Sequence, residues 1–212
     1  MRPIGIDRTF FDDAWRATWQ ALVLRAPDEV LAELLARWAE PHRRYHTLQH
    51  LQECLALCAQ HRARADHPGE VAIATWFHDA IYDTSRHDNE AASADWAARV
   101  LREAGAPDAV VARVEALILA TRHSVPARTA DERLLVDIDL AILGASPARF
   151  DEYERQIRDE YGFVPEPVFR AKRGEVLRGF LERPAIFETP ALAERFERVA
   201  RGNLARAIER LG

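Results

Sequence analysis

The sequence predicts an all-α fold, a single helical bundle of about ten helices joined by short connections. Three observations support this prediction. Apolar residues recur at helical spacing along almost the whole chain, strand-like alternation is nearly absent, and Gly and Pro fall mostly between the periodic stretches. Neither an internal repeat nor a linker rich in Pro, Gly or Ser interrupts the 212 residues, so residues 1–212 are expected to form one domain.

Residues that start and stop helices set the expected elements in order. Pro27 separates the first two helices. Asp88 is expected to cap the fifth helix and Gly105 to end it, and Gly144 ends the seventh. The expected helices are residues 7–24, 27–40, 45–61, 70–83, 88–105, 107–123, 131–144, 146–162, 166–183 and 189–211.

Composition bounds the classes of function. The formal net charge is -5 and both charge signs are interspersed, so no basic patch indicates a nucleic-acid partner. No apolar run approaches the roughly 20 residues that span a bilayer. The N-terminus lacks the apolar stretch of a signal peptide, which makes a cytoplasmic location the expectation. Cys54 and Cys58 are expected to pack as small apolar groups, since a C-x-x-x-C pair alone is weak evidence for metal binding.

The segment "ATWFHDAIYD", residues 74–83, places a histidine beside an aspartate in an apolar run. Ionisable groups are costly to bury unless they are paired or bound to a metal. Because the run is apolar on nearly all sides, it predicts a central, buried helix that contains both His78 and Asp79. A His-Asp pair alone is a weak signal, but this setting favours a paired or metal-bound state for both groups.

A second pair of histidines lies in "YHTLQH". His46 and His50 are four residues apart, so they share one face of the expected helix. A zinc protease of the H-E-x-x-H type would need Glu at the position that Thr47 occupies, which excludes that class.

Two aspartates lie in "LLVDIDLAILG". Arg133 is placed to pair with Asp137, one helical turn away. Asp139 has only apolar turn neighbours, so it is expected on the more buried face, where a carboxylate without a counter-charge would have a raised pKa. A metal ion would remove that cost, and Asp139 is therefore preferred over Asp137 as a ligand.

Two imidazoles and two carboxylates, from His50, His78, Asp79 and Asp139, make the candidate ligand set. Such mixed ligands suit Mn, Fe, Co, Ni or Zn, and suit Mg less well, without selecting among them. Four protein ligands on one octahedral divalent ion leave positions for water and substrate. The ion would lower the pKa of its water and neutralise a phosphoryl oxygen.

Seven features in order resemble the HD-domain metal-dependent phosphohydrolase superfamily. Within it, the resemblance is closest to an uncharacterised group described as predicted metal-dependent HD superfamily phosphohydrolases. The features are "RRYHTLQH", "WFHDAIYD", "NEAASA", "TRHS", "DIDLAILG", "IRDEY" and Arg173, over roughly residues 41–175. The resemblance implies an all-α HD fold with a metal-site core at about residues 41–145. It also implies that His50, His78, Asp79 and Asp139 bind the metal directly.

The resemblance also suggests catalytic roles. "YHTLQHLQE" is similar to the Y-H-N-x-x-H segment of cyclic-nucleotide phosphodiesterases, which implies a general-acid role for His46, although Thr47 replaces the Asn. Glu90 could act as a general base or orient the metal water; the alternative is a first-turn Glu stabilised by the helix dipole. Asp83 could hold the attacking water or cap the helix that carries the HD pair.

Three residues are candidates for substrate binding. His123 could contact a phosphate or a second metal, or could simply sit near a helix C-terminus. Arg158 and Arg173 could bind a substrate phosphate in a bidentate manner. Salt bridges to nearby acidic residues are the alternative for both arginines.

The favoured function is a metal-dependent phosphohydrolase, a phosphomonoesterase or phosphodiesterase that acts on a small phosphate ester or nucleotide with metal-bound water as nucleophile. One alternative is a catalytically idle HD domain that serves as a nucleotide-binding or regulatory module. Another is a di-iron HD oxygenase, for which His87 and His123 would be the extra ligands. No nucleic-acid or membrane partner is expected, and the sequence defines neither the substrate nor the oligomeric state.

Overall fold

The structure is a computed structural model that describes residues 8–212. Within this range it contains ten α-helices, two short 3-10 helices and no strand, which confirms the all-α prediction. None of these helices combines the length and the apolar character needed to cross a membrane. The chain forms two compact units that divide between Val136 and Asp137, and the single-domain assignment stays a prediction.

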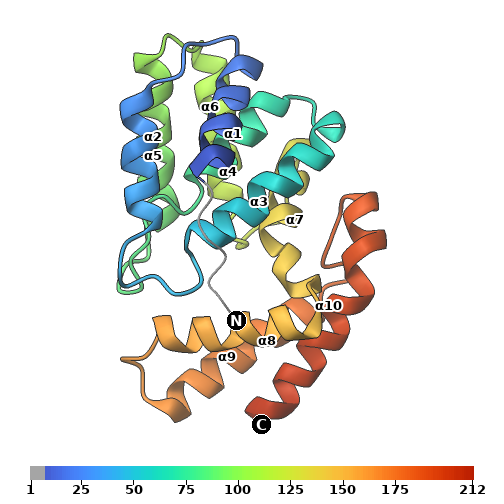
Figure 1. Cartoon of the computed structure of the whole chain (residues 1–212). Helices are drawn as coiled ribbons and strands as arrows, with labels where there is room; N and C mark the ends of the chain where they lie inside the picture. Colours follow the sequence, from blue (N-terminus) through green and yellow to red (C-terminus); the bar gives the residue numbers. More distant parts are fainter. Residues whose placement is uncertain (1–7) are drawn as a thin grey trace. The chain divides into compact units, whose positions relative to one another are not determined.

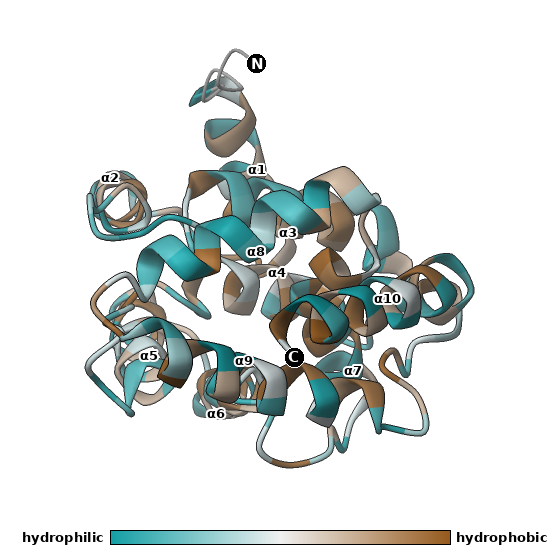
Figure 2. Ribbon diagram, turned by 90° about the horizontal axis from the view of Figure 1, so that it is seen from below, coloured by the Kyte–Doolittle hydropathy of each residue, from teal (hydrophilic) through white to brown (hydrophobic). Residues whose placement is uncertain are grey.

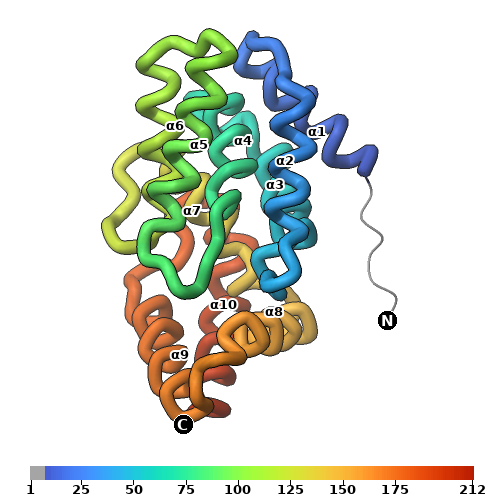
Figure 3. Tube along the Cα trace, turned by 90° about the vertical axis from the view of Figure 1, so that its left-hand side faces the viewer, coloured from blue at the N-terminus to red at the C-terminus, as the bar shows by residue number. Residues whose placement is uncertain are grey.

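The first unit is built around one helix. In it α4 packs against α1, α3, α5 and α6 (Figure 1), and α5 and α6 lie side by side (Figure 3). From Ile73 to Phe77 every side chain of α4 is fully buried, so the predicted central helix is confirmed. The elements are α1 (Arg8–Ala21), α2 (Asp28–Trp38), α3 (Leu48–His61), η1 (Arg62–Arg64), α4 (Pro68–Phe77), α5 (Asn89–Glu103), α6 (Asp108–Ala120) and the first part of α7 (Ala130–Asp139).

Tryptophans bind α1 and α2 to this central helix. The ring of Trp76 meets that of Trp15 edge to face at 5.2 Å, and its Nε1 donates to the Thr18 hydroxyl at 3.2 Å. Trp38, fully buried at the end of α2, donates from Nε1 to the Trp76 carbonyl at 3.1 Å. Because these large aromatic side chains bury much apolar area, and Trp38 and Trp76 also find acceptors for their Nε1 donors, they fix the position of α4.

Long-range partners set both ends of α4. Asp131 of α7 accepts hydrogen bonds from the backbone N–H groups of Asp66 and His67, just before the helix begins. The helix ends at Phe77 and not, as predicted, at Asp83.

The early end of α4 has an identifiable cause. The backbone carbonyls of Asp79 and Ala80 accept hydrogen bonds from the buried guanidinium of Arg43, so a further helical turn is not needed to satisfy them. His78 is the C-cap residue and Asp79 lies in the turn that follows. The helical placement predicted for this pair is therefore wrong, and a turn brings the two side chains together.

The second unit comprises the end of α7, η2 (Leu140–Gly144), α8 (Pro147–Glu160), α9 (Glu166–Leu181) and α10 (Pro190–Leu211). The residues predicted as the end of one helix thus form a 3-10 helix. Fully buried Asn203 of α10 donates from Nδ2 to the carbonyls of Leu143 and Ala145, which ties η2 to α10. Figure 2 shows hydrophilic and hydrophobic residues mixed along α8, α9 and α10, as amphipathic helices require.

Asp137 reverses the predicted order of burial. Its side chain is 1% exposed, whereas Asp139 is only partly buried. The carboxylate of Asp137 accepts from the backbone N–H groups of Glu188 and Thr189, at the start of α10. Burial raises the pKa of Asp137, and these two hydrogen bonds act in the opposite direction. Asp137 therefore anchors α10, a role that the expected pairing with Arg133 did not foresee.

We predict that Gly144→Ala destabilises the second unit by about 1–3 kcal/mol through overpacking. A Cβ atom at this position would lie 2.5 Å from Cβ and 2.9 Å from Cα of Phe196, whose backbone cannot move aside cheaply. The matched control is Gly179→Ala in α9, where a Cβ meets nothing within 4 Å and the gain in helix propensity is about 1 kcal/mol. Denaturation followed by circular dichroism measures both variants; equal stabilities would contradict the close approach at Gly144.

Candidate metal centre

Two histidines meet in the core of the first unit. His50 is 2% exposed on the first turn of α3, and His78 is 1% exposed at the end of α4. Their Nε2 atoms lie 3.3 Å apart. The Asp79 Oδ2 atom is 3.3 Å from Nε2 of His78 and 4.0 Å from Nε2 of His50. Three of the four predicted ligands are thus together within one unit.

The second nitrogen of each ring is held by a neighbour. His78 Nδ1 lies 2.8 Å from the carbonyl oxygen of Thr75, which can only accept, so this nitrogen carries the proton and Nε2 keeps its lone pair. His50 Nδ1 lies 3.0 Å from the Tyr45 hydroxyl. Hydrogen bonds of this kind, from the outer nitrogen to a carbonyl or hydroxyl, orient histidines that bind metals.

The separations between these atoms suit a shared cation. Two nitrogen or oxygen ligands on one tetrahedral zinc ion, each about 2.05 Å away, are about 3.3 Å apart. The His50–His78 and His78–Asp79 distances are both 3.3 Å. His78 Nε2 keeps a lone pair, so the gap accommodates either a proton shared with His50 Nε2 or a cation, and a divalent ion there would be attracted to both nitrogens. The residues present therefore fit a divalent metal ion.

Arg43 holds the backbone on which the site is built, and the sequence analysis missed it. It is 3% exposed, and its guanidinium donates to the carbonyls of His46 at 3.2 Å, Asp79 at 2.7 Å and Ala80 at 3.0 Å. The guanidinium also pairs with Glu40, which offsets its buried charge. One side chain thus joins the turn before α3 to the turn after α4. The only sequence signal is an arginine just before the first histidine motif.

His46 lies at the edge of this cluster but not on the predicted helix. The helix α3 begins at Leu48, so His46 belongs to the preceding turn, and the shared helical face expected for His46 and His50 is wrong. The turn still brings its Nε2 to 3.9 Å from Asp79 Oδ2, and its ring stacks on Tyr82 with centroids 4.1 Å apart. His46 is partly exposed, as a residue that exchanges protons with a substrate must be.

Cys54 joins the cluster, although it was expected to be only a packing residue. It lies one turn after His50 on α3, is buried, and one ligand atom from each of His50, Cys54 and His78 lies within 4.8 Å of the others. Cys58, also buried, instead shares a hydrogen bond with Thr75. Burial raises the pKa of the Cys58 thiol to about 11, and the Thr75 hydrogen bond opposes this rise.

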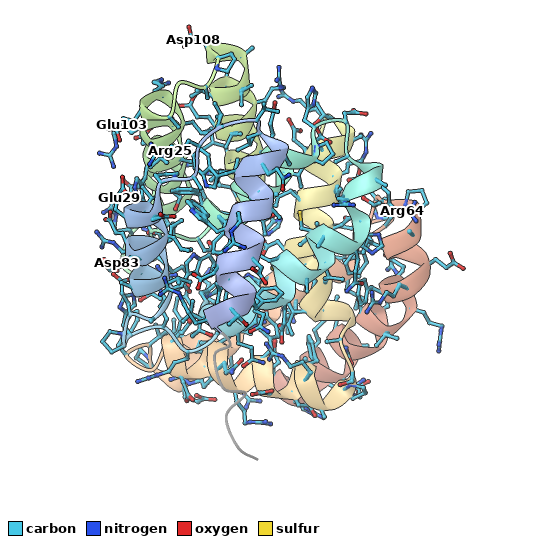
Figure 4. The ribbon with its side chains drawn as sticks, turned by 45° about the horizontal axis from the view of Figure 1, so that its top comes forward. Arg25, Glu29, Arg64, Asp83, Glu103 and Asp108 are labelled. Atoms are coloured by element: carbon cyan, nitrogen blue, oxygen red, sulfur yellow. The ribbon has the colours of Figure 1, made fainter. Side chains whose placement is uncertain are left out.

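The predicted catalytic carboxylates are engaged elsewhere in the first unit. Asp83 is exposed in the loop after α4 (Figure 4), where it accepts from the backbone N–H and the hydroxyl of Ser85. These hydrogen bonds lower the pKa of Asp83. Glu90, in the first turn of α5, forms an ion pair with Arg122 at 3.4 Å. Their catalytic roles stay predictions.

Of the three predicted substrate-binding residues, Arg158 and Arg173 are also engaged. His123 lies just after α6 with a φ of 54°, a left-handed conformation that is uncommon outside glycine. In the second unit, Arg158 donates to the carbonyls of Tyr161 and Val164 and so closes the turn between α8 and α9. Arg173 forms an ion pair with Glu154. Arg158 also pairs with Glu166, so both arginines form salt bridges, the expected alternative to phosphate binding, although with acidic residues other than the nearby ones foreseen.

Asp139, the fourth predicted ligand, is the last residue of α7 and belongs to the second unit. Its surroundings there include the buried hydroxyl of Tyr153. Burial raises the pKa of Tyr153, Arg173 opposes the rise, and the charge of Asp139 adds to it. Its role as a metal ligand stays a prediction.

We predict that Arg43→Lys lowers the free energy of unfolding by about 2–4 kcal/mol, because one ammonium group cannot reach the carbonyls that the planar guanidinium spans. The matched control is Arg44→Lys, an exposed neighbour, for which we expect a change within about 0.5 kcal/mol. Urea denaturation measures both. If the two variants lose the same stability, Arg43 does not hold the site together.

Comparisons with known proteins leave the family open. Neither protein-family models nor curated proteins nor solved structures match this chain. The geometry of the site and the sequence motifs therefore support the function proposed below.

Proposed function

We propose that this protein is a metal-dependent phosphohydrolase that acts on a small phosphate ester or nucleotide. The observation that carries the proposal is the convergence of His50, His78 and Asp79 on one point in the first unit, with the His50–His78 and His78–Asp79 separations at the 3.3 Å expected for two ligands of one ion and the His50–Asp79 separation at 4.0 Å. The resemblance to HD-domain phosphohydrolases, whose motifs include these three residues, also supports the proposal.

The proposal assigns a role to each residue of the cluster. His50, His78 and Asp79 would hold one divalent ion, and Asp139 would complete the set. Such an ion neutralises charge on a phosphoryl oxygen and lowers the pKa of a water molecule. Asp79 is held at its backbone by Arg43 and lies close to His78, so its carboxylate stays oriented toward the ion position.

Proton transfer to the leaving oxygen is assigned to His46. Histidine side chains exchange protons near neutral pH, and His46 combines partial exposure with a position 3.9 Å from Asp79. Glu90 is the weaker candidate for this step because its carboxylate is already paired with Arg122. Tyr82, stacked on His46, keeps the imidazole in one orientation.

The two alternatives differ in what they require. An oxygenase needs a second metal, but among residues 8–212 neither His87 nor His123 belongs to a group of metal-ligand side chains. A regulatory module needs the metal or a nucleotide but no turnover, so activity measurements distinguish it. A cytoplasmic location and a small phosphorylated partner, with no nucleic acid or membrane partner, are part of the proposal.

The test is a panel of phosphomonoesters, nucleotides, cyclic nucleotides and polyphosphorylated nucleotides, assayed with Mn, Fe, Co, Ni, Zn and Mg. We expect wild type to hydrolyse at least one compound and His78→Ala to lose activity by at least about 100-fold. His61→Ala removes an imidazole that accepts from Arg64 at the end of α3, and this control should retain activity. If wild type and His78→Ala hydrolyse every compound at the same rate, the proposal is refuted.

A second experiment separates the two aspartates of "DID". Asp139→Asn is expected to weaken metal binding about tenfold or more, with little effect on the stability of the metal-free protein. Asp137→Asn should instead cost about 1–3 kcal/mol of stability, because it removes an anionic acceptor from the N–H groups of Glu188 and Thr189. Calorimetric metal titration and thermal unfolding measure the two effects. The reverse pattern would make Asp137 the ligand.

A further inference from the structure

Cys54 occupies a position that packing alone does not require. Its Sγ lies 3.7 Å from Nδ1 and 3.8 Å from Nε2 of His50, one turn earlier on the same face of α3. It is 2% exposed, so the thiol lies in the same dry core as the two imidazoles. A small apolar residue would fill this space equally well, and only a thiol adds a soft ligand to the cluster.

The sulfur lies close enough to His50 to share one ion with it after a side-chain rotation. A thiolate about 2.3 Å from zinc and an imidazole nitrogen about 2.05 Å away are about 3.6 Å apart at the tetrahedral angle. The observed Sγ–Nε2 separation of 3.8 Å is close to this value, but the 3.7 Å separation from Nδ1 places the sulfur beside the ring, so sharing the ion requires a rotation about the Cα–Cβ bond of Cys54 that carries Sγ toward the Nε2 side. The ligand atoms of His50, Cys54 and His78 all lie within 4.8 Å of one another, which small rotations about the side-chain bonds can tighten.

Charge balance points in the same direction. Two neutral imidazoles leave a divalent ion with its full charge in a site of low dielectric constant. The carboxylate of Asp79 and a thiolate at Cys54 together supply two negative charges from the first unit. These two groups would neutralise the ion within the first unit, and with Asp139 also bound the site would carry one net negative charge; binding of the ion would replace the thiol proton.

We propose that Cys54 is a thiolate ligand of the metal ion, so that the site prefers a thiophilic ion such as zinc, cobalt or ferrous iron over magnesium. This inference rests on the proposed metal site and adds one ligand to it. It makes His50 and Cys54, on one helix, a ligand pair of the H-x-x-x-C type. Magnesium, which favours oxygen ligands and octahedral geometry, is poorly suited to such a pair.

The test is titration of metal-free protein with Co²⁺, read by absorption spectroscopy. Thiolate bound to Co²⁺ gives a sulfur-to-cobalt charge-transfer band in the near ultraviolet, separate from the visible bands of the ion. We expect the band in wild type and in Cys58→Ser, the matched control one turn away. In Cys54→Ser we expect the visible bands without the charge-transfer band, and at least tenfold weaker binding of Zn²⁺ with little change for Mg²⁺.

The outcomes distinguish this inference from the site on which it rests. If wild type binds Co²⁺ without the sulfur band and His78→Ala does not bind Co²⁺, the role of Cys54 is overturned but the metal site remains supported. No Co²⁺ binding at all would overturn both. X-ray absorption of zinc-loaded wild type needs no variant: one sulfur among the nearest scatterers supports Cys54, and none overturns it.

Discussion

The Nε2 atoms of His50 and His78 face each other at 3.3 Å inside the first unit. The Thr75 carbonyl fixes the proton of His78 on the far side of its ring, so a lone pair points into the gap. Such an arrangement is stable in a dry core only if something positive or a shared proton occupies the gap. The aspartate that follows His78 adds an anionic oxygen to the same point. The proposed ion, its ligands and its chemistry all depend on this convergence.

Most of the first unit serves to keep that convergence in place. Asp131 fixes the start of α4, the tryptophan cluster fixes its faces, and Arg43 fixes the turn after its end. Trp38 lies with its ring 5.4 Å from that of His78 and donates to the Trp76 carbonyl, so it restrains the imidazole and the helix together. Rigid surroundings of this kind hold ligands at their productive separations before the ion arrives, which lowers the cost of binding it.

Much of this could be predicted from sequence, because helical periodicity and helix-stop residues are local signals. The ten helices and the central position of α4 follow from them. The turn at His78 and Asp79 does not, because the guanidinium that replaces the next helical turn comes from Arg43, 36 residues earlier. Asp137 was misjudged for the same reason. Its carboxylate accepts from the backbone N–H of Glu188, which is 51 residues away, whereas the prediction rested on neighbours one helical turn away.

Cys54 differs from those cases, because its signal was local and was given too little weight. A histidine and a cysteine four residues apart share a helical face, just as His46 and His50 were expected to. The C-x-x-x-C spacing of Cys54 and Cys58 is weak evidence for a metal site, whereas the H-x-x-x-C spacing of His50 and Cys54 pairs two ligand types. Spacing between unlike ligand types therefore carries information that a search for repeated cysteines misses.

The most direct test of the account is a crystal structure of protein grown with zinc, from data collected at the zinc absorption edge. The account predicts one anomalous peak within about 2.3 Å of Nε2 of both His50 and His78, with Asp79 among its neighbours. The account would be contradicted if the side chains of the cluster were well ordered but no anomalous peak lay between them, with the two imidazoles hydrogen-bonded to each other.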